Sequence, residues 1–274
     1  MSAARPPLDA RKLEKQLEGL SLVSRLIVLD RVDSTNDTLR ALAREGACEG
    51  TVVLADRQAA GRGRGGRTWH SPAGLGLYIS VLLRPRDSVE RLTRWTLAAA
   101  VAACQACRRT SGVEVEIKWP NDLLWDGRKL GGVLAETRTT SGAPVELVLG
   151  CGLNVAHSVS DFPDELSCRA TSLGIAIGGP PPEREKLAAE YLRELAGMAR
   201  ELNSGSWHEV ARRWERLAPG AVGQRVRVAA GSGTTESFEG VTQGLDTVGA
   251  LRVRREDGRV VRVRLAESIL PLEA

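Results

Sequence analysis

The 274-residue chain lacks the features of a membrane protein or of a disulfide-stabilised secreted protein. No apolar run approaches the ~20 residues that a helix needs to cross a bilayer, and residues 1–7 contain no apolar segment typical of a secretory signal. The five cysteines are an odd number without paired spacing, which argues against a disulfide framework. We therefore expect a cytoplasmic protein that has no membrane partner.

Residues that bind metals are also sparse. Cys104 and Cys107 form a lone C-x-x-C inside a predicted apolar helix over residues 89–108, and there is no second pair to complete a zinc site. We interpret both thiols as small buried hydrophobic groups. The three histidines are scattered, so the sequence predicts no metal site built from protein side chains alone.

The chain is long enough, and at 42% hydrophobic residues apolar enough, for one full core and a smaller second domain. Helix and strand patterns alternate from about residue 21 to 180, and two helices are predicted over 183–202 and 207–217. Short strands with alternating apolar residues follow from about residue 225. We predict an α+β fold with a mixed sheet and a small C-terminal β-barrel. The expected divisions are an N-terminal extension with one amphipathic helix (1–20), a main domain (21–218) and a small domain (219–274).

The most informative segment is a loop of four glycines and three arginines, residues 61–67. Bare glycines let backbone N–H groups close around an anion, and guanidinium groups supply fixed charge with two-point donors. Gly61, Gly63 and Gly66 match a dinucleotide fingerprint, and the segment nearly matches a P-loop. Both patterns require a helix directly after the glycines. Residues 69–76 contain a proline and two glycines and lead into another strand, so we predict a flexible flap between two strands.

A second polar cluster lies at residues 118–132. Lys118-Trp119-Pro120-Asn121-Asp122 ends a predicted strand over 113–117, and Asp126-Gly127 predicts a hairpin turn. Lys129 then enters a strand beside Gly131 and Gly132. A lone lysine is usually a solvated surface residue, but the glycines allow a ligand or another backbone to approach closely, which favours a functional role.

Two further segments carry polar residues beside small ones. Asn154 ends a strand that contains Gly150 and Gly152. Ser34-Thr35-Asn36 begins a predicted helix, where Ser34 is expected as the N-cap and Asp37 completes a capping box. The same free helix terminus also suits hydrogen bonding to a polar ring or a carboxylate.

Together these segments resemble the biotin-protein ligase family, both in the residues of each motif and in the order of the motifs along the chain. The resemblance is strong over about residues 27–173. It rests on Ser34-Thr35-Asn36, Gln58 with Gly61-Arg62-Gly63-Arg64 and Arg67-Thr68-Trp69, Ser71-Pro72 and Gly74, Lys118-Trp119-Pro120-Asn121-Asp122, Arg128-Lys129-Leu130-Gly131-Gly132, Gly150 to Asn154, and Thr171-Ser172-Leu173.

The resemblance implies a catalytic domain like that of class II aminoacyl-tRNA synthetases, with an SH3-like C-terminal domain. It implies a two-step reaction that uses ATP and Mg²⁺. Biotin's carboxylate attacks the α-phosphate of ATP to give biotinyl-5'-adenylate, and a lysine of a biotin carboxyl carrier protein then attacks the acyl carbon. The glycine-rich flap is expected to close over the intermediate and exclude water.

The resemblance also assigns roles to individual residues. The expected catalytic residues are Lys129, Arg64 and Asp122, with Lys129 between the biotin carboxylate and the α-phosphate and Asp122 acting on either Mg²⁺ or a proton. The expected biotin contacts are Ser34, Thr35, Asn36, Gln58, Gly61, Arg62, Gly63, Arg64, Lys129, Gly132 and Gly150. The expected contacts to ATP and the adenylate are Arg64, Arg67, Trp69, Asn121, Asp122, Lys129 and Asn154.

Three alternatives stay open. Lipoate-protein ligases and lipoyl transferases share the fold, although the Gly-Arg-Gly-Arg segment favours biotin. A non-catalytic biotin sensor would not need Lys129. The net charge of +4 invites a nucleic-acid-binding interpretation, but the N-terminal region has only one predicted helix, too little for a helix-turn-helix, so no sequence-specific DNA binding is expected. The family often forms homodimers, and the sequence leaves the oligomeric state open.

Overall fold

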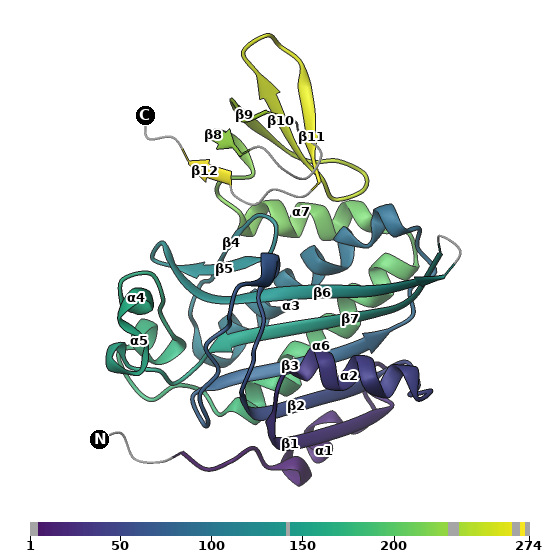
Figure 1. Ribbon diagram of the computed structural model, residues 1–274, viewed down its shortest axis with the longest axis vertical. Helices are drawn as coiled ribbons and strands as arrows, with labels where there is room; N and C mark the ends of the chain where they lie inside the picture. Colours follow the sequence, from purple (N-terminus) through teal and green to yellow (C-terminus); the bar gives the residue numbers. More distant parts are fainter. Residues whose placement is uncertain (1–4, 141–142, 230–235, 265–268, 272–274) are drawn as a thin grey trace.

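The computed structural model describes residues 5–140, 143–229, 236–264 and 269–271, and these form two sheets joined by helices (Figure 1). The larger sheet has the strand order β1-β2-β3-β7-β6-β5-β4. The β1–β2 pair is parallel and the other pairs are antiparallel, which confirms the predicted mixed sheet. Its strands are β1 (Arg25–Val32), β2 (Thr51–Gln58), β3 (Gly76–Leu83), β4 (Glu116–Lys118), β5 (Asp122–Trp125), β6 (Arg128–Thr140) and β7 (Ala143–Asn154).

Helices cover both faces of this sheet. Helices α3 (Thr93–Ser111) and α6 (Arg184–Asn203) pack on each other and on one face, and α2 (Thr35–Arg44) packs on β2, β3 and β7 from the other (Figure 1). Alternate residues of β2 therefore join different cores: Val53 packs with Leu39 of α2, whereas Val52 lies in the main core. Strands covered on both sides become apolar along their whole length, as the burial of every residue of β3 shows.

The N-terminal segment packs on the main domain. Helix α1 (Ala10–Leu17) is the predicted amphipathic helix, and it buries Leu13 and Leu17 in the main core. The buried guanidinium of Arg184 forms an ion pair with Asp56 at 2.7 Å and donates a hydrogen bond to the carbonyl of Pro6 at 2.8 Å. A buried charge is tolerated when it is paired and hydrogen-bonded, so this contact fixes the N-terminal segment against β2 and α6.

The second sheet is antiparallel, with the order β11-β10-β9-β8-β12. Helix α7 (Trp207–Leu217) has the bounds that the sequence predicted and lies between the two sheets (Figure 1). On β9, burial alternates from residue to residue, as expected for a sheet with one solvated face. The strands are β8 (Val222–Val228), β9 (Phe238–Leu245), β10 (Leu251–Arg255), β11 (Val260–Val263) and β12 (Ile269–Pro271).

Three local predictions were wrong in detail. Ser34 is the N-cap residue of α2, but its side chain makes no capping hydrogen bond, and the carboxylate of Asp37 accepts from Arg62 at 2.6 Å instead of closing a capping box. The strand expected over 113–117 is β4, Glu116–Lys118, because Val113 and Val115 pack into the core before the ladder begins. The helix expected over 89–108 is α3, Thr93–Ser111, preceded by a 3₁₀ turn.

Cys104 and Cys107 are free and buried within α3, as predicted. Burial raises the pKa of the Cys107 thiol to about 12 and raises that of Cys104 as well. Both thiols therefore stay protonated at neutral pH and pack as small apolar groups.

A buried histidine lies beyond β7, just before α4 (Asp164–Ser167) and α5 (Leu173–Ile177). The ring of His157 is 1% exposed and stacks on Phe162 with 4.8 Å between ring centroids. Neither of its nitrogens has a hydrogen-bond partner among the described residues. Burial, aided by nearby His70, lowers the pKa of His157 to about 4. The imidazole is therefore neutral in the folded protein at neutral pH.

We predict that this histidine makes folding sensitive to acid. Its folded pKa lies below the unfolded value of about 6.5, so the unfolded state binds the proton first as pH falls. Between about pH 7.5 and about pH 5 the free energy of unfolding should drop by about 2 kcal/mol from this group alone. Urea unfolding of wild type and of His157→Gln at both pH values measures this drop in the free energy of unfolding. An equal pH-dependent loss in both proteins would show that His157 is not the cause.

Candidate functional site

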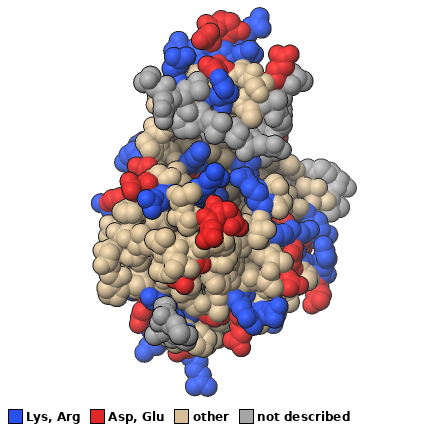
Figure 2. All heavy atoms as spheres, turned by 60° about the vertical axis from the view of Figure 1, so that its left-hand side comes forward, with Lys and Arg blue, Asp and Glu red and all other residues tan. Residues whose placement is uncertain are grey.

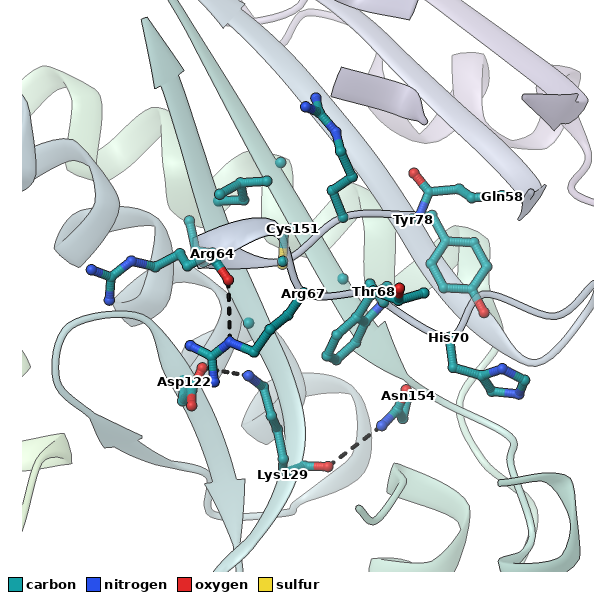
Figure 3. A pocket seen from close by; sticks show the side chains of 18 of the residues that line it. Gln58, Arg64, Arg67, Thr68, His70, Tyr78, Asp122, Lys129, Cys151 and Asn154 are labelled. Atoms are coloured by element: carbon teal, nitrogen blue, oxygen red, sulfur yellow. Dashed lines mark hydrogen bonds and ion pairs between the residues drawn. The ribbon is translucent and has the colours of Figure 1, made fainter. Parts of the chain in front are cut away.

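A cavity of about 340 Å³ lies where the N-terminus of α2, the glycine-rich loop and strands β5, β6 and β7 meet (Figure 3). The structure brings nearly all of the predicted site residues together there, although they are spread over more than a hundred positions of sequence. Of the predicted set, Gly61 alone is not part of the lining; the others are Ser34, Thr35, Asn36, Gln58, Arg62, Gly63, Arg64, Arg67, Trp69, Asn121, Asp122, Lys129, Gly132, Gly150 and Asn154.

One end of the cavity has an uncharged hydrogen-bonding floor. The backbone N–H and the hydroxyl of Thr35 both donate to Gln58 Oε1, at 2.9 and 3.1 Å. Gln58 Nε2 donates to the hydroxyl of Ser71 at 2.9 Å. From β3, Ser80 Oγ lies 2.8 Å from the hydroxyl of Thr35 and 2.6 Å from Asn36 Oδ1. These fixed donors and acceptors suit a small polar ring in an otherwise apolar pocket.

Glycines on β7 make room for this floor and for the indole beside it. A Cβ atom on Gly150 would lie 2.3 Å from Asn36 Oδ1, and one on Gly152 would lie 2.6 Å from Trp69 Nε1. Side chains two residues apart on a strand share a face. The two glycines therefore hold Asn36 and Trp69 side by side against the same face of the sheet.

The other end of the cavity is basic (Figure 3). Lys129 Nζ lies 2.6 Å from Asp122 Oδ1 and 5.7 Å from the centroid of the Trp69 ring. Arg64 donates to Asn121 Oδ1 at 3.2 Å, and burial lowers the pKa of Arg64, with Asp122 opposing the shift. Arg67 Nε donates to the backbone carbonyl of Arg64 at 3.1 Å, which holds the guanidinium of Arg67 against the loop.

Asp122 is the only carboxylate among the described residues that line this cavity. Lys129, Arg64 and Arg67 share the basic end with this one acid. Their positive charges repel one another in the partly buried pocket, so a bound polyanion would relieve that repulsion. Over the wider face that Figure 2 shows, basic side chains are interspersed with acidic ones.

The backbone of Lys129 forms two hydrogen bonds with the segment around Ala170. Its N–H donates to the carbonyl of Arg169 at 2.7 Å, and its carbonyl accepts from the N–H of Thr171 at 2.9 Å. The side-chain amide of Asn154 donates to the carbonyl of Thr171 at 2.9 Å and lies 3.4 Å from the carbonyl of Lys129. Asn154 was expected beside ATP; in the structure its amide joins the strand of Lys129 to the segment that follows α4.

The glycine-rich loop connects β2 and β3, as the sequence predicted. Arg62 and Thr68 form an isolated antiparallel bridge across it, and residues 64–66 make a short 3₁₀ turn. Gly65 and Gly66 have φ values of +63° and +73°, a left-handed conformation that other residues rarely adopt. These two adjacent glycines allow the chain to reverse without a helix after them, which distinguishes the loop from a P-loop.

Sequence reasoning missed one wall of the cavity. It is formed by the segment between β7 and α5, whose only helices are a 3₁₀ turn (Val159–Asp161) and the four-residue α4. Elements this short give no periodic signal in the sequence. His70, next to the loop, is one of the three scattered histidines and had no predicted role. The wall consists of Phe162, Leu166, Arg169 and Ala170, together with His70.

The residues described by the structure include no group of three or more histidine, cysteine or acidic side chains placed to hold a metal ion. The oxygens near the cations are those of Asn121 and Asp122. Mg²⁺ is commonly bound through one or two carboxylates plus the phosphates of a substrate. This donor set fits an ion that enters together with a polyphosphate.

Comparisons with known proteins agree with this geometry. Residues 28–154 match the biotin/lipoate A/B protein ligase family model. The chain is 36% identical over 233 residues to a bifunctional ligase/repressor BirA of Bacillus spizizenii, covering 85% of this chain and 70% of that protein. It is 36% identical over 253 residues to the biotin--[acetyl-CoA-carboxylase] ligase of Mycobacterium tuberculosis, covering 90% of each.

A solved structure shares the fold over nearly the whole chain. The biotin protein ligase of Aquifex aeolicus in complex with biotin and ATP superposes with a TM-score of 0.77 at 29% identity, covering 91% of this chain and all of that one. Among the residues described, no helix is long and apolar enough to span a membrane. Sequence, fold and cavity together show that the chain belongs to the biotin/lipoate A/B protein ligase family, and it is similar to biotin protein ligases of that family.

Proposed function

We propose that this chain is an ATP-dependent ligase that attaches biotin to a lysine of the biotin carboxyl carrier domain of acetyl-CoA carboxylase. The observation that supports it most directly is the division of one cavity into an uncharged hydrogen-bonding floor and a basic end. A ring with a ureido group fits the floor, and a carboxylate tail and a triphosphate fit the cations. The relatives of the chain carry the same activity in their names.

The first step joins two anions. An oxygen of the biotin carboxylate bonds to the α-phosphorus of ATP as the bond to the pyrophosphate oxygen breaks, giving biotinyl-5'-adenylate. We place Lys129, at the basic end of the cavity, beside both the biotin carboxylate and the α-phosphate, where its ammonium group can offset the charge of both reactants. Arg64 and Arg67 approach from the loop and stabilise the charge that develops on the phosphate oxygens.

In the second step the ε-amine of the carrier lysine attacks the acyl carbon, and AMP leaves. The carrier lysine is an ammonium ion at neutral pH and must lose a proton before its nitrogen can attack. The carboxylate of Asp122, beside Lys129, is the group placed to accept it. Mg²⁺ would be held by the ATP phosphates with oxygens of Asn121 and Asp122, and when bound it supplies further positive charge at the phosphates.

The uncharged floor binds one substrate, biotin, and the indole of Trp69 lies beside the other, ATP. Thr35, Asn36 and Gln58 bind the ureido end of biotin, with Ser34 at the edge of the same pocket. The indole of Trp69, which packs close to Gly152, contacts the adenine. The proposal extends to an SH3-like character for the C-terminal sheet and to a cytoplasmic location.

A direct test incubates the protein with ATP, Mg²⁺ and a biotin carboxyl carrier domain, with biotin or lipoate in parallel, and measures carrier mass. We expect a gain of one biotin that requires ATP and the carrier lysine. Modification with lipoate but not with biotin would identify the chain as a lipoate ligase of the same family. No change in carrier mass with either biotin or lipoate would favour a non-catalytic biotin sensor.

Matched substitutions on β7 separate the two substrate ends. Gly150→Ala should displace Asn36 and raise the KM for biotin by about tenfold or more, whereas Gly152→Ala should displace Trp69 and raise the KM for ATP. Steady-state kinetics with each substrate varied, and circular dichroism to verify folding, measure both effects. If the two variants affect the two KM values alike, the division of the cavity is wrong.

A further inference from the structure

The first arginine of the glycine-rich loop does not join the other cations. The guanidinium of Arg62 turns to the opposite side and donates to Asp37 Oδ1 at 2.6 Å and to Glu136 Oε2 at 2.9 Å. Asp37 belongs to the first turn of α2, and Glu136 lies in β6. A side chain from the loop thus binds two elements of the rigid domain.

Glu136 is a junction between the loop and the floor of the cavity. Its Oε2 accepts from Arg62 and also from Asn36 Nδ2 at 2.8 Å, and its Oε1 accepts from Arg40 at 3.3 Å. Asn36 in turn contacts Ser80, which contacts Thr35. Charge-assisted hydrogen bonds of this kind are stronger than neutral ones.

The same network reaches the other end of the loop. Thr35 donates to Gln58, Gln58 donates to Ser71, and Ser71 donates to the carbonyl of Trp69. Hydrogen-bonded contacts therefore run from Arg62 at one end of the loop, through the floor, to Trp69 at the other. Both ends of the loop are connected to the residues proposed to bind biotin.

The middle of the loop has little else to hold it. A Cβ atom placed on Gly65 or Gly66 would meet nothing within 4 Å, and one on Gly63 would meet only Arg67 of the same loop. A segment without packed side chains depends on its few polar contacts for its position. The contacts of Arg62 and the bond from Arg64 to Asn121 are those contacts.

We propose that Glu136 is a positioning residue that holds the glycine-rich loop closed over the cavity by binding Arg62, and ties that closed position to Asn36 in the floor. Glu136 holds the loop in this way whichever ligand the cavity binds. The consequence for biotin rests on the proposed function: a loosened loop binds biotin more weakly and releases more adenylate to water before the carrier arrives.

The test variant is Glu136→Gln, which keeps the shape of the side chain and an acceptor for Asn36 but removes the charge that Arg62 binds. Trypsin cleaves after arginine, so fragments that begin at Gly65 report opening of the loop in the ligand-free protein. We expect their rate of formation to rise about threefold to tenfold. The KM for biotin should rise by a similar factor while kcat for adenylate formation stays within about twofold.

The matched control is Glu146→Gln. Glu146 lies on β7 and pairs with Arg138 and Arg84, away from the loop. The Glu146→Gln variant should leave trypsin cleavage after Arg64 and the KM for biotin unchanged. Arg62→Met also removes the contact to Asp37 and should accelerate cleavage at least as much as Glu136→Gln. The double variant should be no worse than Arg62→Met alone, because Glu136 acts on the loop through Arg62.

Three results would overturn the proposal: cleavage after Arg64 that Glu136→Gln does not accelerate, equal acceleration in Glu146→Gln, or additive effects in the double variant. Faster cleavage in a protein that fails to biotinylate a carrier would leave the loop-holding role intact and count against the proposed function alone.

Discussion

The site depends on the placement of one ammonium group. The backbone N–H and carbonyl of Lys129 both bond to one neighbouring segment, at Arg169 and Thr171, and its side chain is oriented by Asp122. A flexible four-carbon side chain could point in many directions, and these contacts direct it to the basic end of the cavity, beside Asp122 and Trp69. The bulged start of β6, the amide of Asn154 and the segment after α4 all contribute to that restriction. Preorganised charge of this kind stabilises a transition state without reorganising when the reaction occurs.

Much of the site could be predicted from the sequence because its residues follow local backbone signals. Asp126-Gly127 forms the predicted hairpin turn with positive φ at both residues, which fixes Lys129 near the start of β6. The proline and glycines after residue 69 exclude a helix, and the structure has a strand there. The paired glycines of β7 indicated close approach, and the groups that approach are Asn36 and Trp69. These features depend on a few neighbouring residues, so their patterns can be read along the chain.

The remaining features depend on contacts between distant segments. A capping box was the local interpretation of Ser34 and Asp37, but Asp37 binds Arg62 of the loop, 25 positions away. The wall around Phe162 and Arg169 comes from an irregular segment that no periodicity marks. Likewise, nothing near Glu136 in sequence indicates that its carboxylate receives Asn36 and Arg62 together. Such pairings follow from the order of strands in the sheet, which local patterns do not determine.

The most direct test of the role of Lys129 is biotin-dependent exchange of labelled pyrophosphate into ATP, without any carrier, because this isolates the first step. Wild type should exchange, and Lys129→Ala should be slower by about a thousandfold or more. Lys118→Ala, which removes an exposed lysine of β4 outside the cavity lining, should exchange normally. Exchange by Lys129→Ala within about tenfold of wild type would contradict the account.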